Sequence, residues 1–247
     1  MNYALAIKNI SVAYQQVPVI YDINFSITIG SLVAIIGPNG SGKTTLLRSI
    51  MGLIKPIQGT ISILNQPHKT QSNKIAYIPQ RSSVDWNFPA TSLDIVIMGS
   101  YGKLKFGQRP GQKEKELALQ ALAKVHMTDY ANTPIRELSG GQQQRLFIAR
   151  ALVQDTEIYL LDEPFIGVDI TTETIIFNLF KQLQQQNKTI IVVHHDLLTV
   201  KKYFDTVLLM NKTVIAYGAT SSVITSTNIS KAFPNYIDTK ILSADIL

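Results

Sequence analysis

The sequence predicts an α/β fold with a mainly parallel sheet. Three short apolar runs, at residues 32–36, 158–161 and 189–193, have the length and composition of strands buried in a parallel sheet. The first two runs are followed by helical segments whose apolar residues recur on one face. Residues 4–29 alternate polar and apolar instead, so we expect antiparallel strands with one wet face before the parallel core.

The composition is that of an ordinary globular protein. At 247 residues, with 45% hydrophobic and 16% charged residues, the chain suits one large α/β domain or two small ones. It has no cysteine, which excludes disulfides and thiolate metal sites. No apolar run approaches the roughly 18 residues of a membrane helix. We therefore expect no secretory signal near the start and a chain that stays in the cytoplasm.

The formal net charge of +6 is compatible with a nucleic-acid partner, an anionic membrane surface or a merely solvated basic surface. No dense basic run with interleaved aromatic residues is present. This favours the solvated surface, and we expect no nucleic-acid partner.

Tyr14 ends the first alternating stretch. An aromatic side chain in this position is able to stack on an adenine ring, which contributes about 1–3 kcal/mol per base. A tyrosine packed on the protein surface explains the residue equally well, so both interpretations stay open on the residues alone.

A phosphate-binding loop is the most informative motif. Gly37–Thr45 fits GxxxxGK(S/T) and joins the first apolar strand to an amphipathic helix at residues 43–51. There, unpaired backbone N–H groups and the positive end of the helix dipole face a ligand, and glycines allow close approach, so a ligand-free turn is disfavoured. Lys43 would bind the β- and γ-phosphates, and Thr44 would bind Mg²⁺. The candidate residues are Gly37, Pro38, Asn39, Gly40, Ser41, Gly42, Lys43, Thr44 and Thr45.

Two features follow the strand expected at residues 74–78. Gln80 stands at its end, where a glutamine is able to contact Mg²⁺ or an attacking water, although an isolated glutamine is a solvated loop residue by default. Residues 84–89 hold the only tryptophan, Trp86, beside Phe88 and Pro89. Such a cluster is either a local packing unit or an exposed docking surface.

Residues 92–131 have a helical pattern, with apolar stripes separated by a loop at residues 99–112. We expect a helical insertion with Leu93, Val96 and Ile97 on one stripe. Ser139 then precedes two glycines and a further helix, and it suits the N-cap position. The chain thus has a second helix start whose amides are able to hold an anion.

Polar residues end the other two apolar strands. Asp162 and Glu163 follow one of them, and adjacent carboxylates at the carboxyl end of a parallel strand indicate a purpose beyond capping it. Asp162 is able to hold Mg²⁺, and Glu163 to act as general base. His194 and His195 end the other strand, and only one of them should face a γ-phosphate because neighbouring strand residues point to opposite faces.

The remaining elements carry no functional prediction. A helix should begin at Thr171 or Thr172 and bury one apolar face, formed by Ile175, Ile176, Leu179, Phe180 and Leu183. Residues 207–217 should form a hairpin that closes the sheet, and the last thirty residues a short helix and a tail.

The motifs together resemble the nucleotide-binding subunit of an ATP-binding cassette (ABC) transporter. Residues 138–142 read Leu-Ser-Gly-Gly-Gln, which is the signature sequence of that superfamily, and the motifs match in order over nearly the whole chain. The resemblance implies a P-loop NTPase (RecA-like) core with a mainly parallel sheet, an N-terminal antiparallel β subdomain and a helical insertion subdomain. One ABC ATPase domain would span residues 1–247, with the core in about 1–90 and 155–247 and the helical subdomain in about 91–154.

The resemblance also implies roles for individual residues. ATP and Mg²⁺ are the implied cofactors, and two copies would bind two nucleotides in a head-to-tail dimer that hydrolysis releases. By resemblance, Tyr14 stacks on adenine, Gly37–Thr45 is the Walker A loop, Gln80 is the Q-loop residue, Asp162 and Glu163 are the Walker B pair, Asp169 lies in the D-loop, His195 is the switch histidine, and Ser139, Gly140, Gly141 and Gln142 cover the nucleotide of the other copy.

Variant motifs narrow the resemblance to one subgroup. Residues 80–81, 85–89, 98–102 and 165–169 resemble the subgroup that serves importers of manganese, zinc or iron(II). This implies an ATPase that energises import of a divalent metal, manganese first, through separate permease subunits at the cytoplasmic face of the membrane, with a solute-binding protein. Because the region after the Q-loop touches the membrane subunit in this family, a docking role for Trp86 and Phe88 is favoured.

Two other functions are compatible with parts of the sequence. One is an ABC ATPase for another substrate or outside transport, for example in iron–sulfur cluster assembly. The other is an ATP-dependent interaction module without catalysis, which the intact set of Lys43, Asp162, Glu163 and His195 disfavours.

Overall fold

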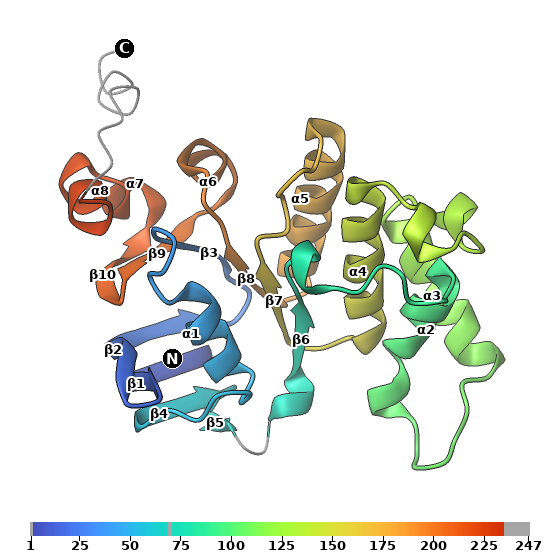
Figure 1. Cartoon of the computed structure of the whole chain (residues 1–247), viewed down its shortest axis with the longest axis horizontal. Coiled ribbons are helices and arrows are strands. Elements are labelled where there is room, and N and C mark those ends of the chain that lie inside the picture. Colours follow the sequence, from blue (N-terminus) through green and yellow to red (C-terminus); the bar gives the residue numbers. More distant parts are fainter. Residues whose placement is uncertain (1, 69–70, 235–247) are drawn as a thin grey trace. The chain divides into compact units, whose positions relative to one another are not determined.

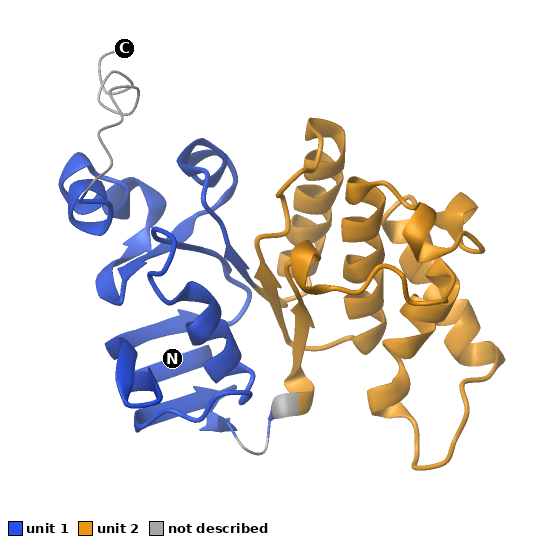
Figure 2. Ribbon diagram, viewed as in Figure 1, with its two compact units in different colours: residues 1–72, 191–247 blue, residues 73–190 orange. Residues whose placement is uncertain are grey.

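The structure is a computed structural model that describes residues 2–68 and 71–234. The chain divides into two compact units, one of residues 1–72 and 191–247 and the other of residues 73–190 (Figure 2). This division by compactness does not test the subdomain boundaries expected near residues 91 and 155, which stay a prediction. The expected tail lies largely outside the described residues.

The first unit begins with an antiparallel sheet of strand order β2-β1-β4-β5. Its first two strands form the predicted pair, joined by Gln15 and Gln16, whose positive φ values of 46° and 70° suit a two-residue hairpin turn. Alternate residues are buried, as the polar–apolar alternation predicted. The strands are β1 (Tyr3–Tyr14), β2 (Val17–Thr28), β4 (Gln58–Ile63) and β5 (Gln66–Pro67).

The remaining strands of the first unit form its parallel part. Strand β3 (Leu32–Ile36) is fully buried, pairs in parallel with β9 (Thr206–Asn211), and leads through the glycine-rich loop into helix α1 (Lys43–Ile50) (Figure 1). Strand β10 (Thr213–Ala219) pairs with β9 as the predicted hairpin. The unit also contains α6 (Leu197–Tyr203), α7 (Thr220–Val223) and α8 (Ser226–Ala232).

Strand β8 (Thr189–Val193) has the predicted bounds and five buried residues. Its last part belongs to the first unit, where the backbone N–H of His194 donates to Ile35 O of β3 at 3.0 Å. The ends of β8 and β3 are therefore neighbours, which brings the histidine pair to the same sheet edge as the glycine-rich loop.

The second unit contains the parallel strands β6 (Ile75–Ile78) and β7 (Ile158–Asp162). Helices α2 and α3 pack against α4, and α4 packs against α5 (Figure 1). Gly99 allows the close approach of α2 to α4, because a Cβ there would lie 2.3 Å from Arg150 O. The helices are α2 (Ser92–Met98), α3 (Gln112–Lys124), α4 (Gly140–Gln154) and α5 (Ile170–Gln185).

Two details of the helices differ from the prediction. Helix α5 begins at Ile170 with Asp169 as N-cap, so the predicted start at Thr171 or Thr172 is wrong: the Asp169 carboxylate accepts from the Thr172 N–H at 2.9 Å. Its buried face includes Phe177, which stacks on Phe165 at 4.6 Å between ring centroids, while Ile175 is only half-buried.

In α2 the buried face is also rotated from the predicted stripe. Ile95 and Val96 are buried, whereas Leu93 and Ile97 are half-buried. The helix has only seven residues, and its packing against α4 decides which side is covered. Over residues 2–68 and 71–234, no helix has the length and apolar character needed to cross a membrane.

Candidate functional site

The glycine-rich loop of the first unit forms a preorganised anion cradle. Gly42 occupies the N-cap of α1 with φ of 94°, and no side chain caps the helix. The Lys43 side chain is buried, and its Nζ donates to Gly37 O at 2.8 Å and to Pro38 O at 2.9 Å. The lysine thus lies folded over the loop, and the amides at the helix start are left without a side-chain acceptor.

Neighbouring strands hold this loop tightly. A Cβ on Gly42 would lie 2.1 Å from Cγ2 of Ile20 on β2, and one on Gly37 would lie 2.1 Å from Met210 O on β9. Inside the loop, the buried Ser41 hydroxyl has no hydrogen-bond partner within the described part of the chain. A buried polar atom without a partner is costly, so this hydroxyl fits a loop that takes up an anionic ligand. The residues therefore fit a nucleotide phosphate.

Tyr14 lies near the tip of the β1–β2 hairpin, and 41% of its surface is exposed. The second strand of that hairpin is the one that touches the loop through Ile20. The exposure of the Tyr14 side chain is more consistent with a ring available for stacking than with a tyrosine packed on the protein surface. Adenine stacking by Tyr14 stays a prediction.

The two histidines after β8 lie in different environments. His194 is buried, and burial together with the neighbouring His195 lowers its pKa to about 4, against a smaller opposing effect of Asp196. His195 is exposed at the carboxyl end of the strand. Only His195 is therefore available to a ligand, as the strand geometry predicted for one of the pair. Its role as switch histidine is not tested by this geometry.

An acidic pair ends β7 in the second unit. Asp162 is 3% exposed, and the Tyr77 hydroxyl lies 3.5 Å from its Oδ2. Glu163 is half-buried and has a left-handed backbone with φ of 52°, which is uncommon for a non-glycine residue and costs on the order of 1–3 kcal/mol. Gln80 Nε2 donates to Glu163 Oε2 at 2.7 Å. The structure thus places Gln80 in contact with Glu163, which directly follows Asp162, at the ends of the paired strands β6 and β7.

The second glycine-rich helix start also lies in the second unit. Ser139 caps α4 as predicted, since its Oγ accepts from Gln142 N at 3.3 Å and Gln142 Oε1 accepts from Ser139 N at 2.7 Å. A Cβ on Gly141 would lie 3.1 Å from Thr172 Oγ1 and 3.4 Å from Asp169 Oδ2. Gly141 therefore lets the start of α4 lie against the start of α5.

Asp169 is committed to capping α5. Its carboxylate accepts from the Thr172 N–H and, at 2.8 Å, from the Thr172 hydroxyl. These hydrogen bonds, that of the Thr172 N–H first, lower the pKa of Asp169, so the group is a carboxylate at neutral pH. The structure brings the predicted signature and D-loop residues together within one unit.

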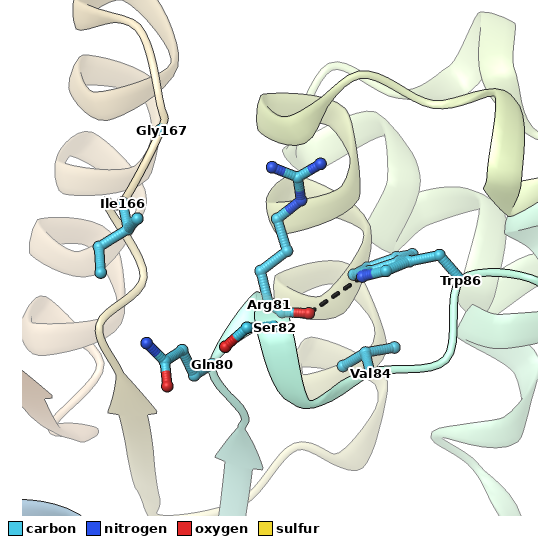
Figure 3. A pocket seen from close by; sticks show the side chains of 7 residues that line it. All are labelled: Gln80, Arg81, Ser82, Val84, Trp86, Ile166 and Gly167. Atoms are coloured by element: carbon cyan, nitrogen blue, oxygen red, sulfur yellow. Dashed lines mark hydrogen bonds between the residues drawn. The ribbon is translucent and has the colours of Figure 1, made fainter.

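The loop after Gln80 lines one side of an open pocket of about 340 Å³ (Figure 3). Trp86 is half-buried and packs edge-on against Phe147 with ring centroids 5.2 Å apart, whereas Phe88 is 48% exposed. The two aromatic residues thus differ: Trp86 is in part a packing residue, and Phe88 offers a surface. The pocket is lined by Gln80, Arg81, Ser82, Val84, Trp86, Ile166 and Gly167.

The candidate Mg²⁺ ligands have suitable chemistry. Asp162 supplies a carboxylate, Gln80 an amide oxygen and Thr44 a hydroxyl, and Mg²⁺ prefers such oxygen donors. Thr44 lies in the first turn of α1 with its side chain exposed. Over the described ranges, no group of three or more His, Asp or Glu side chains is arranged to hold a metal ion.

Comparison with known proteins agrees with this set of motifs. The family model described as "ABC transporter" matches residues 20–166, more than half of the chain. The chain belongs to the ABC transporter family. It is 48% identical over 239 residues to the zinc transport system ATP-binding protein TroB of Treponema pallidum, covering 97% of this chain and 90% of TroB. It is also 48% identical over 231 residues to the manganese transport system ATP-binding protein MntB of Bacillus subtilis, covering 94% of this chain and 92% of MntB.

Solved structures agree with the same ABC fold. A structure described as an inward-facing conformation of a metal-chelate type ABC transporter is 33% identical, with a TM-score of 0.84 over 95% of this chain and 90% of that chain. A dimeric bacterial ABC transporter cassette is 29% identical, with a TM-score of 0.78 over 87% of this chain and 98% of that one. The predicted P-loop NTPase fold class, the family and the assignment as an ATPase are confirmed.

Sequence reasoning missed several residues of this ABC ATPase site. Tyr77 contacts Asp162 from the neighbouring strand, Thr172 binds Asp169, and Arg81 binds Gln143 of α4. Tyr77 lies on β6 three residues before Gln80, and that spacing is the one signal that could have suggested it. The other two contacts depend on helix packing, for which the local sequence carries no pattern.

Proposed function

We propose that this chain is the ATP-hydrolysing subunit that energises import of a divalent transition metal, manganese first and zinc or iron next, through a separate membrane permease. The hydrogen bond of 2.7 Å between Gln80 and the strained Glu163 is the observation that best supports hydrolysis, because it holds a carboxylate at a strand end. The names of the relatives, zinc for TroB and manganese for MntB, support the metal.

The phosphate loop performs the first step, which is binding. Amides of residues 37–45 receive the phosphate oxygens, and Lys43 moves its charge from two loop carbonyls toward the β- and γ-phosphates. Tyr14 stacks on the adenine ring. Thr44, Asp162 and Gln80 would hold Mg²⁺, which would neutralise phosphate charge.

Glu163 performs the chemical step as general base. Its carboxylate accepts a proton from the attacking water, and Gln80, which donates to Glu163 Oε2, orients that carboxylate. The exposed His195 donates a hydrogen bond to the γ-phosphate, while the buried His194 stays neutral and supports the strand end.

A second copy of the chain completes the site. Ser139, Gly140, Gly141 and Gln142, with Asp169 beside them, cover the nucleotide that the other copy holds at Lys43. Two nucleotides then join two copies head to tail, and hydrolysis releases them. The chain is a peripheral membrane subunit that binds permease subunits at the cytoplasmic face, and a solute-binding protein delivers the metal.

The experiment is to co-purify the chain with its permease and reconstitute the complex in vesicles. We expect ATP-dependent movement of Mn²⁺, and of Zn²⁺ or Fe²⁺ less strongly, when the metal-loaded binding protein is supplied. The matched control is the same complex with Glu163→Gln, which should bind ATP and move no metal. Failure to co-purify any permease, or ATP hydrolysis that none of the three metals stimulates, would overturn the metal-import proposal while leaving the ATPase assignment intact.

A further inference from the structure

Arg81 connects the loop after β6 to the first turn of α4. Its Nε donates to Gln143 Oε1 at 2.6 Å, and Gln143 is itself 4% exposed, with its Nε2 3.4 Å from Ile135 O. Figure 3 shows the Arg81 side chain extending away from Gln80, the residue that precedes it. The two consecutive residues therefore serve different elements: Gln80 binds Glu163 after β7, and Arg81 binds α4.

The guanidinium of Arg81 also covers Gly140. A Cβ on Gly140 would lie 2.7 Å from Arg81 Nη1 and 3.1 Å from Cζ, so a side chain at this position has no room while Arg81 stays in place. Gly140 does not have a positive φ, so backbone conformation does not demand glycine. A side chain in the second position of the Ser139–Gln142 motif would therefore displace the guanidinium of Arg81 from the start of α4.

The main chain of Arg81 is also held by a hydrogen bond. The indole Nε1 of Trp86 donates to Arg81 O at 3.0 Å (Figure 3), and the Trp86 ring packs edge-on against Phe147 of α4. The Arg150 guanidinium lies 4.7 Å from the centroid of the Phe147 ring, one turn further along the helix. Residues 80–86 therefore contact α4 at its first turn, through Gln143, and at its second turn, through Phe147.

Stability of α4 alone does not explain the position of Arg81. A cation beside a helix N-terminus is unfavourable with respect to the helix dipole, and this helix start is already capped by Ser139 and Gln142. The position of Arg81 is understandable if its contact with Gln143 links the start of α4 to Gln80, because the same loop holds Gln80 against Glu163.

We propose that Arg81 is a positioning residue that makes the Gln80–Glu163 pair and the Ser139–Gln142 turn move as one body during ATP hydrolysis. This inference rests on the proposed roles of those residues. Arg81 does not touch the reacting atoms. It fixes the distance between the hydrolytic pair and the turn that closes on the nucleotide of the second copy, so its loss should affect turnover and spare nucleotide binding at Lys43.

The test uses Trp86 as a built-in reporter, because it is the only tryptophan of the chain. Arg81→Met removes the Nε donor and keeps an unbranched side chain. In the purified full chain without nucleotide, it should raise the acrylamide quenching constant of Trp86 by about twofold, and kcat for ATP should fall about tenfold with KM within twofold. Arg109→Met, which removes an exposed guanidinium elsewhere in the unit, should change neither quantity.

Gly140→Ala supplies a second and independent variant. Alanine is a good helix former, so the helix should tolerate it, and the new methyl group should displace only the far end of Arg81. It should raise Trp86 quenching in the wild-type background and have no further effect when combined with Arg81→Met. Effects that add would show that the two residues act separately, which would overturn the proposal.

The remaining outcomes distinguish failure of the positioning role of Arg81 from failure of the proposed function. Unchanged quenching and unchanged kcat in Arg81→Met would remove the positioning role and leave the proposed function intact. A wild-type chain without ATP turnover would remove the proposed roles of Gln80 and Glu163, and the positioning role with them. A rise in KM with unchanged kcat would assign Arg81 to nucleotide binding and would equally overturn the proposal.

Discussion

Two helices of this protein start at glycine-rich motifs, and they start in different ways. Helix α1 has Gly42 at its N-cap, a left-handed φ of 94° and no side-chain cap. Helix α4 has Ser139 at its N-cap, and the side chains of Ser139 and Gln142 satisfy each other's backbone N–H groups. One helix start is left open, and the other is closed by its own residues.

The glycines serve different purposes at the two starts. Around α1, Gly40 and Gly42 adopt positive φ, and Gly37 and Gly42 allow the loop to approach neighbouring strands closely. At α4, Gly140 and Gly141 have no positive φ and instead make room for Arg81 and Thr172. The open start therefore fits its proposed role of holding phosphate, whereas the closed start fits its proposed role of covering a nucleotide that another copy holds.

The largest expected effect tests whether the two starts act on one nucleotide. Glu163→Gln should slow hydrolysis by about 10²–10⁴-fold, because the amide cannot accept the proton of the attacking water. ATP binding should persist, and the protein should accumulate as an ATP-bound dimer in which the α4 start of one copy covers the α1 start of the other. Phosphate release and light scattering measure the two effects, and the exposed Glu116→Gln is the matched control. Unchanged turnover in Glu163→Gln would remove this residue as the base.

The open start can be tested through its lysine. Lys43→Ala should weaken MgATP binding by about 100-fold, since it removes two charge-assisted hydrogen bonds to phosphate at roughly 1.5 kcal/mol each. It also frees the carbonyls of Gly37 and Pro38, which Lys43 holds in the unliganded loop. Equilibrium titration with a fluorescent nucleotide measures the affinity, with the exposed Lys8→Ala as control. Wild-type affinity in Lys43→Ala would show that the α1 start holds phosphate without it.

The two helix starts also show which features of the fold and the candidate site can be predicted from the sequence. Residues 37–45 predict an open helix start because glycines and a lysine between a strand and a helix favour a specific backbone conformation that binds phosphate. One apolar run likewise predicts β8 with the bounds that the structure has. The Ser139 cap was predicted for the same reason, since capping residues act locally. Local chemistry therefore defined most strands and both helix starts.

Contacts between elements that are distant in the chain could not be predicted from the sequence. The N-cap of α5 was misplaced because Asp169, Thr171 and Thr172 are all capping residues, and only the fold selects Asp169. Arg81 belongs to one of the variant motifs, but its contact with Gln143 could not be predicted, because Gln143 lies 62 residues further along the chain. The roles of the site residues remain predictions.

Gly42→Ala and Gly40→Ala separate backbone strain from contact at the open start. Both glycines have positive φ, of 94° and 77°, so alanine is strained at either position. A Cβ at Gly42 would lie 2.1 Å from Cγ2 of Ile20, whereas a Cβ at Gly40 meets nothing within 4 Å. Gly42→Ala should therefore lower the free energy of unfolding by about 2 kcal/mol more than Gly40→Ala. Urea denaturation measures the difference, and equal losses would mean that Ile20 does not confine the loop.

The smallest expected effect concerns the closed start, where Ser139 is both the helix cap and the proposed nucleotide contact. Ser139→Ala should lower the free energy of unfolding by about 1 kcal/mol through loss of the cap, as should Thr91→Ala, the matched cap of α2. Ser139→Asp should keep wild-type stability, because aspartate is an equally good N-cap. Its carboxylate would repel a γ-phosphate brought by a second copy, so ATP-dependent dimerisation should be lost in Ser139→Asp and retained in Thr91→Ala. A Ser139→Asp protein that dimerises normally with ATP would mean that the α4 start does not face the phosphate, and its cap would then serve the helix alone.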